Sequence, residues 1–477
     1  MVAVAQRAIR ATPGAAKFTC TTMAMNVDMT TQPLHAAADV AALAQRGVVL
    51  PRPELVSIGA EVPLDAIAAG AVLHPGCRLY GAETRVDEGA ELGTGGAVTL
   101  HDAWVGTRAA IGTLGPVTLV RTAAGPGTVL GCGVAEDAVF LGKEVADPAF
   151  TTGFGFRVRK GSLYEEDANS AQHTDTKMTV LLPWVTLGSN INWCDILVAG
   201  GMGPGLGEFS EVGSGAVHFN FTPRGDKATG SCLGDVCSGV FLDQPRLFIG
   251  GNGSIIGPCT AAFGAVTGAG ERYGGDLRPG LNLPLPHPDE EAAAGFDLSY
   301  YGAVKRVVLR QLHLVGQLSA LDAWYAGVRA HLAAGDAARQ ALYARGRAMV
   351  GWNLAERIKQ LDALVARVDD SVQLLYTHLP GDVRIPQQWA LVNAWNDIRP
   401  HLEQHAEQQQ APPQAPPQAL LDGLDTAAAA HGPAYTAIIR GLSPEARAAG
   451  HAWLQGIAER VAAPTLLQSV PDLPRRG

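Results

Sequence analysis

The sequence predicts a β-solenoid built from hexapeptide repeats, followed by an α-helical domain. Glycine accounts for 57 of the 477 residues, against roughly 33 at its usual share of about 7%. Of these glycines, 40 lie between residues 70 and 280, and alanine, leucine, arginine and glutamine become prominent after that point. Within the glycine-rich part, apolar residues recur every six or seven positions, first at Leu73, Leu79, Val86, Leu92, Val98, Val105, Ile111 and Val117.

A period of six fits neither an α-helix, which repeats every 3.6 residues, nor a long strand, which alternates every two. It fits short strands joined by tight turns, in which each periodic residue points inward and stacks on its counterpart in the next coil. The alternative is a β-sandwich, but sandwich strands repeat every 8–12 residues. The register resumes at Val129, Ala135, Leu141, Val185, Ile191, Leu197, Ile249 and Ile255. Small residues often follow the apolar ones, and we expect them to form the tight turns between successive strands.

Changes in composition divide the chain into six segments. We expect a disordered or leader segment over 1–50, the solenoid over 51–278, a proline-rich linker over 279–295, an α-helical domain over 296–402, a Gln/Pro low-complexity linker over 403–418 and a helical tail over 419–477. One buried helical stripe is predicted at Val350, Leu354, Ile358, Leu361, Val365 and Val368. Residues 150–180 and 200–209 interrupt the period of six, and such loops are where solenoids usually carry specificity.

Bulk properties exclude several classes of function. The formal net charge of −9 disfavours nucleic acid as a partner. No run of 18 apolar residues exists, so the sequence predicts no membrane span. The seven cysteines are scattered without a Cys-x-x-Cys pair, which predicts no metal site and favours free thiols in a reducing cytoplasm.

The most informative motif lies between residues 210 and 235. Val-Gly-Ser-Gly occupies residues 212–215, Asn-Phe follows at residues 220–221, Lys227 comes next, and Leu-Gly-Asp occupies residues 233–235. This order resembles the acetyltransferase domain of the bifunctional N-acetylglucosamine-1-phosphate uridylyltransferases, which is a glucosamine-1-phosphate acetyltransferase. The resemblance is strong over about 90 residues. Over the rest of the solenoid it is loose, because the hexapeptide repeat is shared by many proteins.

The resemblance implies a left-handed parallel β-helix that forms a homotrimer. It also implies transfer of an acyl group from acetyl-CoA, or another acyl-CoA, to a sugar phosphate or sugar nucleotide. By this resemblance, the substrate-binding residues are Asn220, Phe221 and Lys227. The phosphate also needs cations, and Arg224 is expected to supply one together with Lys227. Gly257 is the expected contact for CoA along the coils.

The family's catalytic base, a histidine, is missing from its expected position. The family's spacing puts the base at or near Asp195, so the candidates for proton transfer are Asp195, His218 and His173. Residues two apart share a face of a strand, so His218 and Asn220 are expected to point the same way. If that direction is outward, His218 is a usable base, and if it is inward, His218 is buried.

Two functions therefore stay open. The sequence favours an acyltransferase, whereas the missing histidine favours a non-catalytic sugar-nucleotide-binding or scaffold protein whose helical domain docks a protein partner. The Leu-x-x-Gly-x-Gly-Thr-x-Met signature of the family's nucleotidyltransferase domain is absent. UDP-N-acetylglucosamine pyrophosphorylase activity is therefore not expected.

Overall fold

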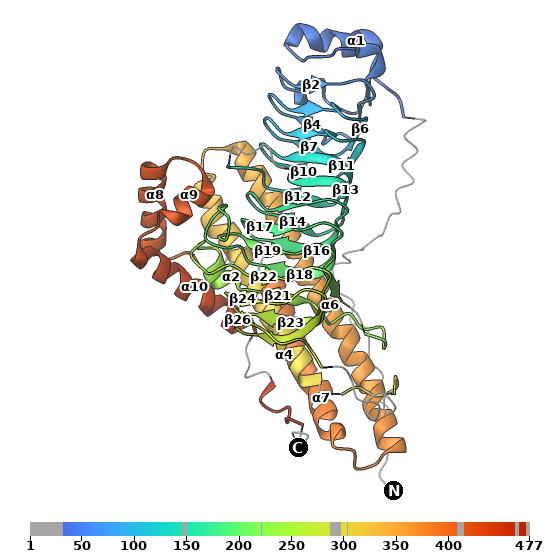
Figure 1. Cartoon of the computed structure of the whole chain (residues 1–477), viewed down its shortest axis with the longest axis vertical. Helices are drawn as coiled ribbons and strands as arrows, with labels where there is room; N and C mark the ends of the chain where they lie inside the picture. Colours follow the sequence, from blue (N-terminus) through green and yellow to red (C-terminus); the bar gives the residue numbers. More distant parts are fainter. Residues whose placement is uncertain are drawn as a thin grey trace.

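A parallel β-solenoid of about 12 turns fills the first half of the chain, and helices lie along one side of it (Figure 1). The computed structural model describes residues 32–145, 150–220, 222–286, 297–302, 304–407, 415–462 and 467–473. One turn takes roughly eighteen residues, or three hexapeptide repeats, so that, for example, Val180 lies beside Leu197 of the next coil. The solenoid predicted from the sequence is thus confirmed over residues 57–281.

Each turn contributes to three parallel sheets, which we call the first, second and third faces. The first face contains β1 (Ser57–Ile58), β3 (Arg78–Tyr80), β6 (Val98–His101), β9 (Val117–Val120), β11 (Val129–Glu136), β13 (Thr152–Val158), β16 (Asp175–Leu181), β18 (Asn192–Val198), β20 (Val217–Phe219), β23 (Ser254–Ala261) and β25 (Arg272–Leu277).

The second face contains β2 (Val72–Leu73), β5 (Glu91–Leu92), β8 (Ala110–Ile111), β15 (Asn169–Ser170), β17 (Val185–Leu187), β19 (Ser210–Val212), β22 (Phe248–Ile249), β24 (Ala265–Val266) and β26 (Gly280–Leu281). The third face contains β4 (Arg85–Val86), β7 (Trp104–Val105), β10 (Ala123–Ala124), β12 (Ala138–Phe140), β14 (Ser162–Tyr164) and β21 (Ser231–Leu233). The longer strands β11, β13, β16, β18, β23 and β25 bend around a corner and belong to two faces.

The inward column predicted from the period of six is confirmed in the first coils. All eight residues from Leu73 to Val117 are buried in the solenoid interior. The prediction slips by one residue at three later positions, where Leu130, Phe140 and Val198 point inward instead of their neighbours Val129, Leu141 and Leu197. Leu141 and Leu197 are buried on the outside of the third face, against the helices, so both sides of the strand are apolar there.

One corner of the solenoid uses small residues at only some of its turns, contrary to our expectation. Between the first and third faces, the chain turns through residues with positive φ: Gly81 (86°), Asp102 (50°), Arg121 (44°), Asp137 (50°), Met178 (47°) and Asp195 (60°). Aspartate tolerates this left-handed conformation better than most side chains because its carboxylate can bond locally. The corner therefore carries charged side chains beside the third face.

The segment predicted to be disordered or a leader over residues 1–50 folds in its described part. α1 (Ala37–Ala42) and the 3-10 helix η1 (Leu43–Arg46) cover the first coil, where Val40, Leu43 and Val48 are buried. Two further 3-10 helices, η2 (Pro53–Leu55) and η3 (Leu64–Ala66), lie in the same coils. Such a cap covers the apolar end of the stack. The remainder of the prediction, residues 1–31, lies outside the described part of the chain.

The helical part is confirmed over residues 304–462. It contains α4 (Val304–Trp324), the π-helix η4 (Tyr325–Arg329), α5 (Ala330–Leu332), α6 (Ala337–His378), α7 (Arg384–Glu407), α8 (Gln418–His431), α9 (Tyr435–Arg440) and α10 (Pro444–Ala462). A short helix, α2 (Val236–Gly239), follows β21 within the solenoid. α7 runs past residue 402, and much of both expected linkers (287–296 and 408–414) lies outside the described residues.

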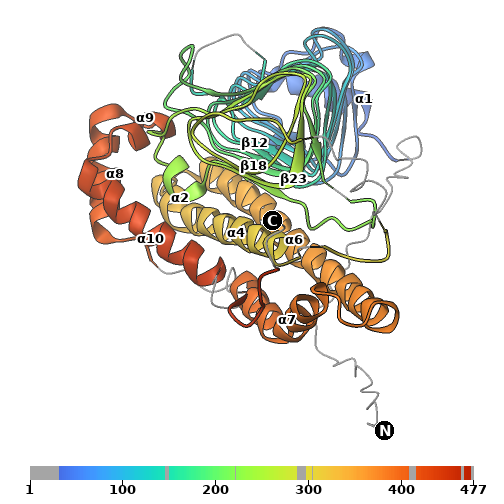
Figure 2. The ribbon, with the colours of Figure 1, turned by 60° about the horizontal axis from the view of Figure 1, so that its bottom comes forward.

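α4 and α6 lie side by side against the third face (Figure 2). The predicted stripe of α6 is buried here, and its residues share one hydrophobic core with Val139, Leu163 and Val180 of the solenoid. Two α4 side chains bond to the solenoid backbone: Gln311 Nε2 donates to Gly230 O at 2.8 Å, and Gln317 Oε1 accepts from Val236 N at 2.8 Å. Within the described residues, none of the helices is long and apolar enough to cross a membrane.

Candidate functional site

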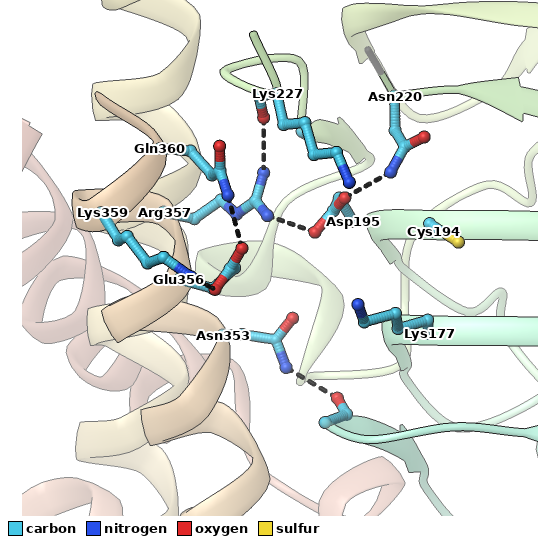
Figure 3. A network of polar contacts seen from close by, with 12 residues as sticks. Lys177, Cys194, Asp195, Asn220, Lys227, Asn353, Glu356, Arg357, Lys359 and Gln360 are labelled. Carbon is cyan, nitrogen blue, oxygen red and sulfur yellow. Dashed lines mark hydrogen bonds and ion pairs between the residues drawn. The ribbon is translucent and has the colours of Figure 1, made fainter. Parts of the chain in front are cut away.

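The seam between the solenoid and α6 contains three of the eight site residues predicted from the sequence, Asp195, Asn220 and Lys227. We use the word seam for Lys177, Cys194, Asp195, Asn220, Lys227, Asn353 and Arg357 (Figure 3). The first five belong to the solenoid coils and their loops, whereas Asn353 and Arg357 lie one helical turn apart on α6. The seam follows the charged corner between the first and third faces.

A buried ion pair lies at the centre of the seam. Asp195, the corner residue of β18, forms an ion pair with Arg357, and both are nearly inaccessible to solvent. Asn220 Nδ2 donates to the other oxygen of Asp195 at 2.6 Å. Arg357 also donates to the carbonyl of Lys227 at 3.5 Å. Because an unpaired charge would be costly at this depth, Asp195 and Arg357 each require the other.

A second contact fixes α6 one turn away. Asn353 Nδ2 donates to the carbonyl of Gly161 at 2.7 Å and to that of Met349 at 2.9 Å. These bonds satisfy a buried solenoid carbonyl with a side chain of the helix. The position of α6 along the corner is therefore set by polar contacts as well as by apolar packing.

Two lysines flank the buried pair on its solvent side. Lys177 and Lys227 are exposed, and neither has an ion-pair partner within 4.0 Å among the described residues. Figure 3 shows the Lys227 side chain beside Asp195 and Asn220, and the Lys177 side chain on the other side of Asp195, below Cys194, with which Lys177 pairs in the neighbouring coil. Although the whole chain has a formal charge of −9, two lysines without an ion-pair partner at one seam make it a favourable place for an anion.

His218 points into the solenoid. It lies in β20 next to Ile255 of β23, and its neighbour Val217 pairs with Asn192, so His218 continues an interior column through Trp193. Its Nδ1–H donates to Cys194 O at 2.5 Å, and its Nε2 accepts from the Ser231 hydroxyl at 2.7 Å. Burial lowers the pKa of His218 to about 4, against the opposing effect of the Cys194 hydrogen bond. Both nitrogens are thus engaged, one by the backbone of the seam residue Cys194 and the other by Ser231.

Asn220 does not share the direction of His218, contrary to our expectation. β20 ends at Phe219, so the alternation of side chains stops before Asn220. Asn220 instead reaches across the corner to Asp195. The structure thus brings Asn220, Asp195 and Lys227 together and separates His218 from them.

The other predicted site residues lie apart from the seam or are already engaged. His173 is exposed at a corner with φ of 56° and contacts the Phe154 ring edge to face, with the ring centroids 5.6 Å apart. Arg224 Nη2 donates to Asp297 O at 2.7 Å, and its Cζ lies 5.2 Å from the Tyr301 ring centroid. Phe221 lies outside the described residues.

Gly257, the expected CoA contact, packs against the backbone of a neighbouring segment. A Cβ at this position would lie 1.9 Å from Thr229 O and 2.9 Å from His218 Nε2. Contacts this short require glycine whether or not a cofactor binds. The structure gives Gly257 a packing role, and its expected role in binding CoA stays a prediction.

Sequence reasoning missed Arg357 and Asn353, the two seam residues of α6. The predicted stripe included their neighbours Leu354 and Ile358, but the polar residues within the same buried face were not considered. A charged residue directly before a stripe position is the signal that could have identified Arg357. Its partner, 162 residues earlier in the chain, could not be identified in this way.

A second buried network was also missed. Arg329, in the π-helix η4, donates to both oxygens of Glu166 at 2.6 and 2.9 Å and pairs with Glu165 at 3.0 Å. The hydroxyl of Tyr325 donates to Glu165 at 2.7 Å, and Arg329 Cζ lies 3.8 Å from the Tyr435 ring centroid. Burial raises the pKa of Glu165, although Arg329 opposes the shift. This network fixes the helices to the solenoid corner after β14.

Metal and disulfide chemistry have no visible site in the described part of the chain. The six cysteines whose state is described are free, and no group of three or more His, Cys, Asp or Glu side chains is placed to hold a metal ion. Comparison with protein-family models and with curated proteins finds no match. The resemblance described above therefore rests on the hexapeptide repeat and on the motif at residues 212–235.

Proposed function

We propose that the protein binds a sugar phosphate or sugar nucleotide at the seam between the solenoid and α6. The observation that carries this proposal is the pair of exposed lysines on the two sides of Asp195, Lys227 beside Asn220 and Lys177 beside Cys194. Asn220 and Lys227 are also the positions at which the sequence resembles sugar-phosphate acetyltransferases. The structural and sequence arguments thus support the same place.

Each seam residue has a distinct part in this binding. The ammonium groups of Lys177 and Lys227 would contact phosphate oxygens as point charges. Asn220 has its Nδ2 occupied by Asp195, which leaves its carbonyl oxygen as an acceptor for a sugar hydroxyl. The buried Arg357–Asp195 pair would hold Asn220 in place without touching the ligand.

Acyl transfer from a CoA thioester is a second candidate, favoured by the Asn–Lys motif itself. The reaction requires a base that takes the proton of the attacking amine or hydroxyl. His218 is neutral but inward, and Asp195 is held by Arg357 and Asn220. The geometry therefore supports a non-catalytic binding protein better than an acyltransferase. Acetyl-CoA would be a cosubstrate only if the protein were an acyltransferase.

The assembly expected from the resemblance, a homotrimer, also stays a proposal. α4 and α6 cover the third face, so a trimer would have to form through the first and second faces. The helical part packs on the solenoid of its own chain, and a protein partner would have to dock on its outer side.

Isothermal titration calorimetry with glucosamine 1-phosphate and UDP-N-acetylglucosamine tests the binding site. We expect binding that weakens with salt, and a rise in Kd of about tenfold or more when Lys177→Gln and Lys227→Gln are combined. Lys359→Gln is the matched control, because Lys359 is an exposed lysine of α6 that is paired with Glu356. Unchanged affinity in the double variant would place the site elsewhere.

Release of free thiol from acetyl-CoA tests the second candidate. Thiol release that depends on added sugar phosphate and disappears in the Lys177→Gln, Lys227→Gln variant would favour the acyltransferase. Binding of the sugar phosphate without thiol release would support the first candidate, a non-catalytic binding protein.

A further inference from the structure

A cavity of about 220 Å³ lies at another corner of the solenoid, between the third and second faces. It is lined by Lys143, Val145, Phe150, Thr151, Asp167, Ala168, Asn169, Trp184, Thr186, Pro204 and Phe209. Pro204 and Phe209 belong to the glycine-rich segment 200–209, which interrupts the period of six. This loop therefore closes one side of a cavity that the regular coils alone would leave open.

The walls combine apolar rings with hydrogen-bonding groups. Phe150, Trp184 and Phe209 supply aromatic surface, whereas Asp167, Asn169 and the two threonines supply polar atoms. A cavity of about 150 Å³ is known to hold one benzene molecule. This one therefore has room for a single ring with substituents.

Two buried polar atoms of the lining residues have no hydrogen-bond partner among the described residues. They are Nε1 of Trp184, whose side chain is 3% exposed, and Oδ2 of Asp167. The other oxygen of Asp167 accepts from the backbone N–H groups of Glu144 and Val145 at 3.2 and 3.3 Å. Buried polar atoms are nearly always satisfied, so one donor and one acceptor at the same cavity point to a ligand.

Another aspartate–tryptophan pair in the solenoid shows the contrasting arrangement. Trp104 Nε1 donates to Asp87 Oδ2 at 2.7 Å, so these two groups satisfy each other. Trp104 and Asp87 do not line the cavity. Trp193 Nε1, in the solenoid interior, also lacks a partner among the described residues, so the observation that points to a ligand is that two such atoms belong to residues lining one cavity.

We propose that this cavity binds a neutral, hydroxylated ring compound such as a monosaccharide. A hydroxyl group both donates and accepts, so neighbouring hydroxyls of one ring satisfy Asp167 Oδ2 and Trp184 Nε1 together. The C–H faces of the same ring pack against Phe150 and Phe209. Recognition of a small ring by apolar walls and a few fixed polar groups is how small-molecule sites usually work.

Other ligand classes fit less well. A simple cation would pair with Asp167 but leave the indole N–H unsatisfied. An anion would accept from Trp184 and be attracted by Lys143, which also lines the cavity, but the Asp167 carboxylate would repel it and its Oδ2 would stay without a donor. A purely apolar ring would satisfy neither atom. This site does not depend on the sugar-phosphate seam, because the two use different corners and share no residue.

Saturation-transfer difference NMR and calorimetry on the full chain test the proposal. The probes are D-glucose, D-galactose, D-mannose, N-acetyl-D-glucosamine and their methyl glycosides, with cyclohexylamine as the cation and cyclohexane-1,4-dimethanol as a weakly hydroxylated ring. We expect at least one monosaccharide to bind. Binding of the free sugar but not of its methyl glycoside would identify a free monosaccharide rather than a chain end as the ligand.

Trp184→Phe and Asp167→Asn each remove one of the two groups while keeping the shape of the side chain. We expect each to weaken the monosaccharide about tenfold. Trp104→Phe is the matched control and should leave the affinity unchanged, and the Lys177→Gln, Lys227→Gln variant should leave it unchanged as well. Thermal unfolding of each variant confirms that it is folded.

Three results would overturn the proposal. They are binding of none of the monosaccharides, tighter binding of cyclohexylamine than of any sugar, and sugar binding that Trp184→Phe and Asp167→Asn leave unaltered. A sugar whose affinity falls only in the Lys177→Gln, Lys227→Gln variant would bind at the seam and not in the cavity. The two proposed sites can therefore be refuted separately.

Discussion

His218 illustrates how the direction of one side chain decides between two chemical roles. Its strand is three residues long, and Val217, His218 and Phe219 alternate between half-buried, buried and exposed positions. Inside the solenoid, the imidazole replaces the aliphatic residue of its column and is satisfied by Cys194 O and Ser231. A group in this environment stabilises the interior as a neutral hydrogen-bonding unit.

This environment makes the stability of the protein depend on pH through His218. The pKa in the folded state, about 4, lies below the unfolded value of about 6.5. The stabilisation is therefore present above pH 6.5 and is lost as the pH falls toward 4. When the pH is lowered from 7 to 5, we expect the protonation of this residue in the unfolded state to reduce the free energy of unfolding by about 2 kcal/mol.

Urea unfolding of the wild type and of His218→Gln at pH 7 and pH 5 measures this loss. The variant should be less stable at pH 7 but lose about 2 kcal/mol less than the wild type on acidification. His173→Gln, at an exposed histidine, is the control and should follow the wild type. Equal losses in His218→Gln and the wild type would contradict the assignment.

At the scale of single elements, the π-helix η4 is the feature that the helical pattern did not predict. Tyr325 and Arg329, at its two ends, both reach toward the solenoid, where they contact Glu165 and Glu166. Such irregular turns often occur where a specific contact must be made. Here the contact joins a helix to the solenoid corner, with two carboxylates around one guanidinium.

Removal of the cation should be far more damaging than removal of one carboxylate charge. Arg329→Met leaves Glu165 and Glu166 buried without a cation, and we expect it to lower the free energy of unfolding by about 3–5 kcal/mol. Glu165→Gln keeps one complete pair, Arg329 with Glu166, and should cost much less. Urea titrations at pH 7 compare the two variants, and equal losses would contradict this prediction.

The same network has a pH dependence opposite in sign to that of His218. Burial raises the pKa of Glu165 above its unfolded value, so its stabilisation is present at low pH and is lost as the pH rises through the folded pKa. Relative to the wild type, Glu165→Gln should therefore gain stability between pH 5 and pH 8. The titrations described above, repeated at these two pH values, measure the difference.

At the scale of the whole molecule, the solenoid and the helices share a hydrophobic core. Val139, Leu163, Val180 and Leu197 form an outward column on the third face and are covered by α4 and α6. Burial of each such side chain contributes about 1.5–3 kcal/mol. The helical part is therefore a necessary cover for the solenoid rather than an independent attachment.

A chain that ends at residue 302 tests this dependence. Without α4 and α6, the apolar column of the third face is exposed, and we expect the truncated protein to aggregate. Size-exclusion chromatography with light scattering compares it with the full chain. A monodisperse, folded product would mean that the two parts fold independently, as the linker at residues 279–295 had suggested.

The fold could be predicted well because its signals are local and repeated. Leu73, Leu79 and Val86 already set the inward register, and the same spacing continues over many coils. The prediction slipped at Leu141 and Leu197 because the third face is apolar on both sides. When both sides of a strand are buried, inward and outward residues are both apolar, so the hydrophobic period does not show which of them point inward.

The candidate site could be predicted only in part. Asn220, Lys227 and Asp195 are close in the structure, as the family's motif and its spacing of the base implied. Their surroundings depend on Arg357, which contacts Asp195 across 162 residues of chain. Trp184 and Asp167 drew no attention in the sequence, because an unsatisfied atom is visible only once its neighbours are placed.

The sequence by itself determined a hexapeptide solenoid followed by helices, because the spacing of its apolar residues fits no other regular structure. Only the tertiary structure decided that His218 points inward, that α6 covers the Asp195 corner, and that the loop at residues 200–209 closes a cavity. The physical reason is that these outcomes depend on contacts between distant segments. Such contacts follow from the packing of α6 and the loops on the coils, and no local pattern encodes them.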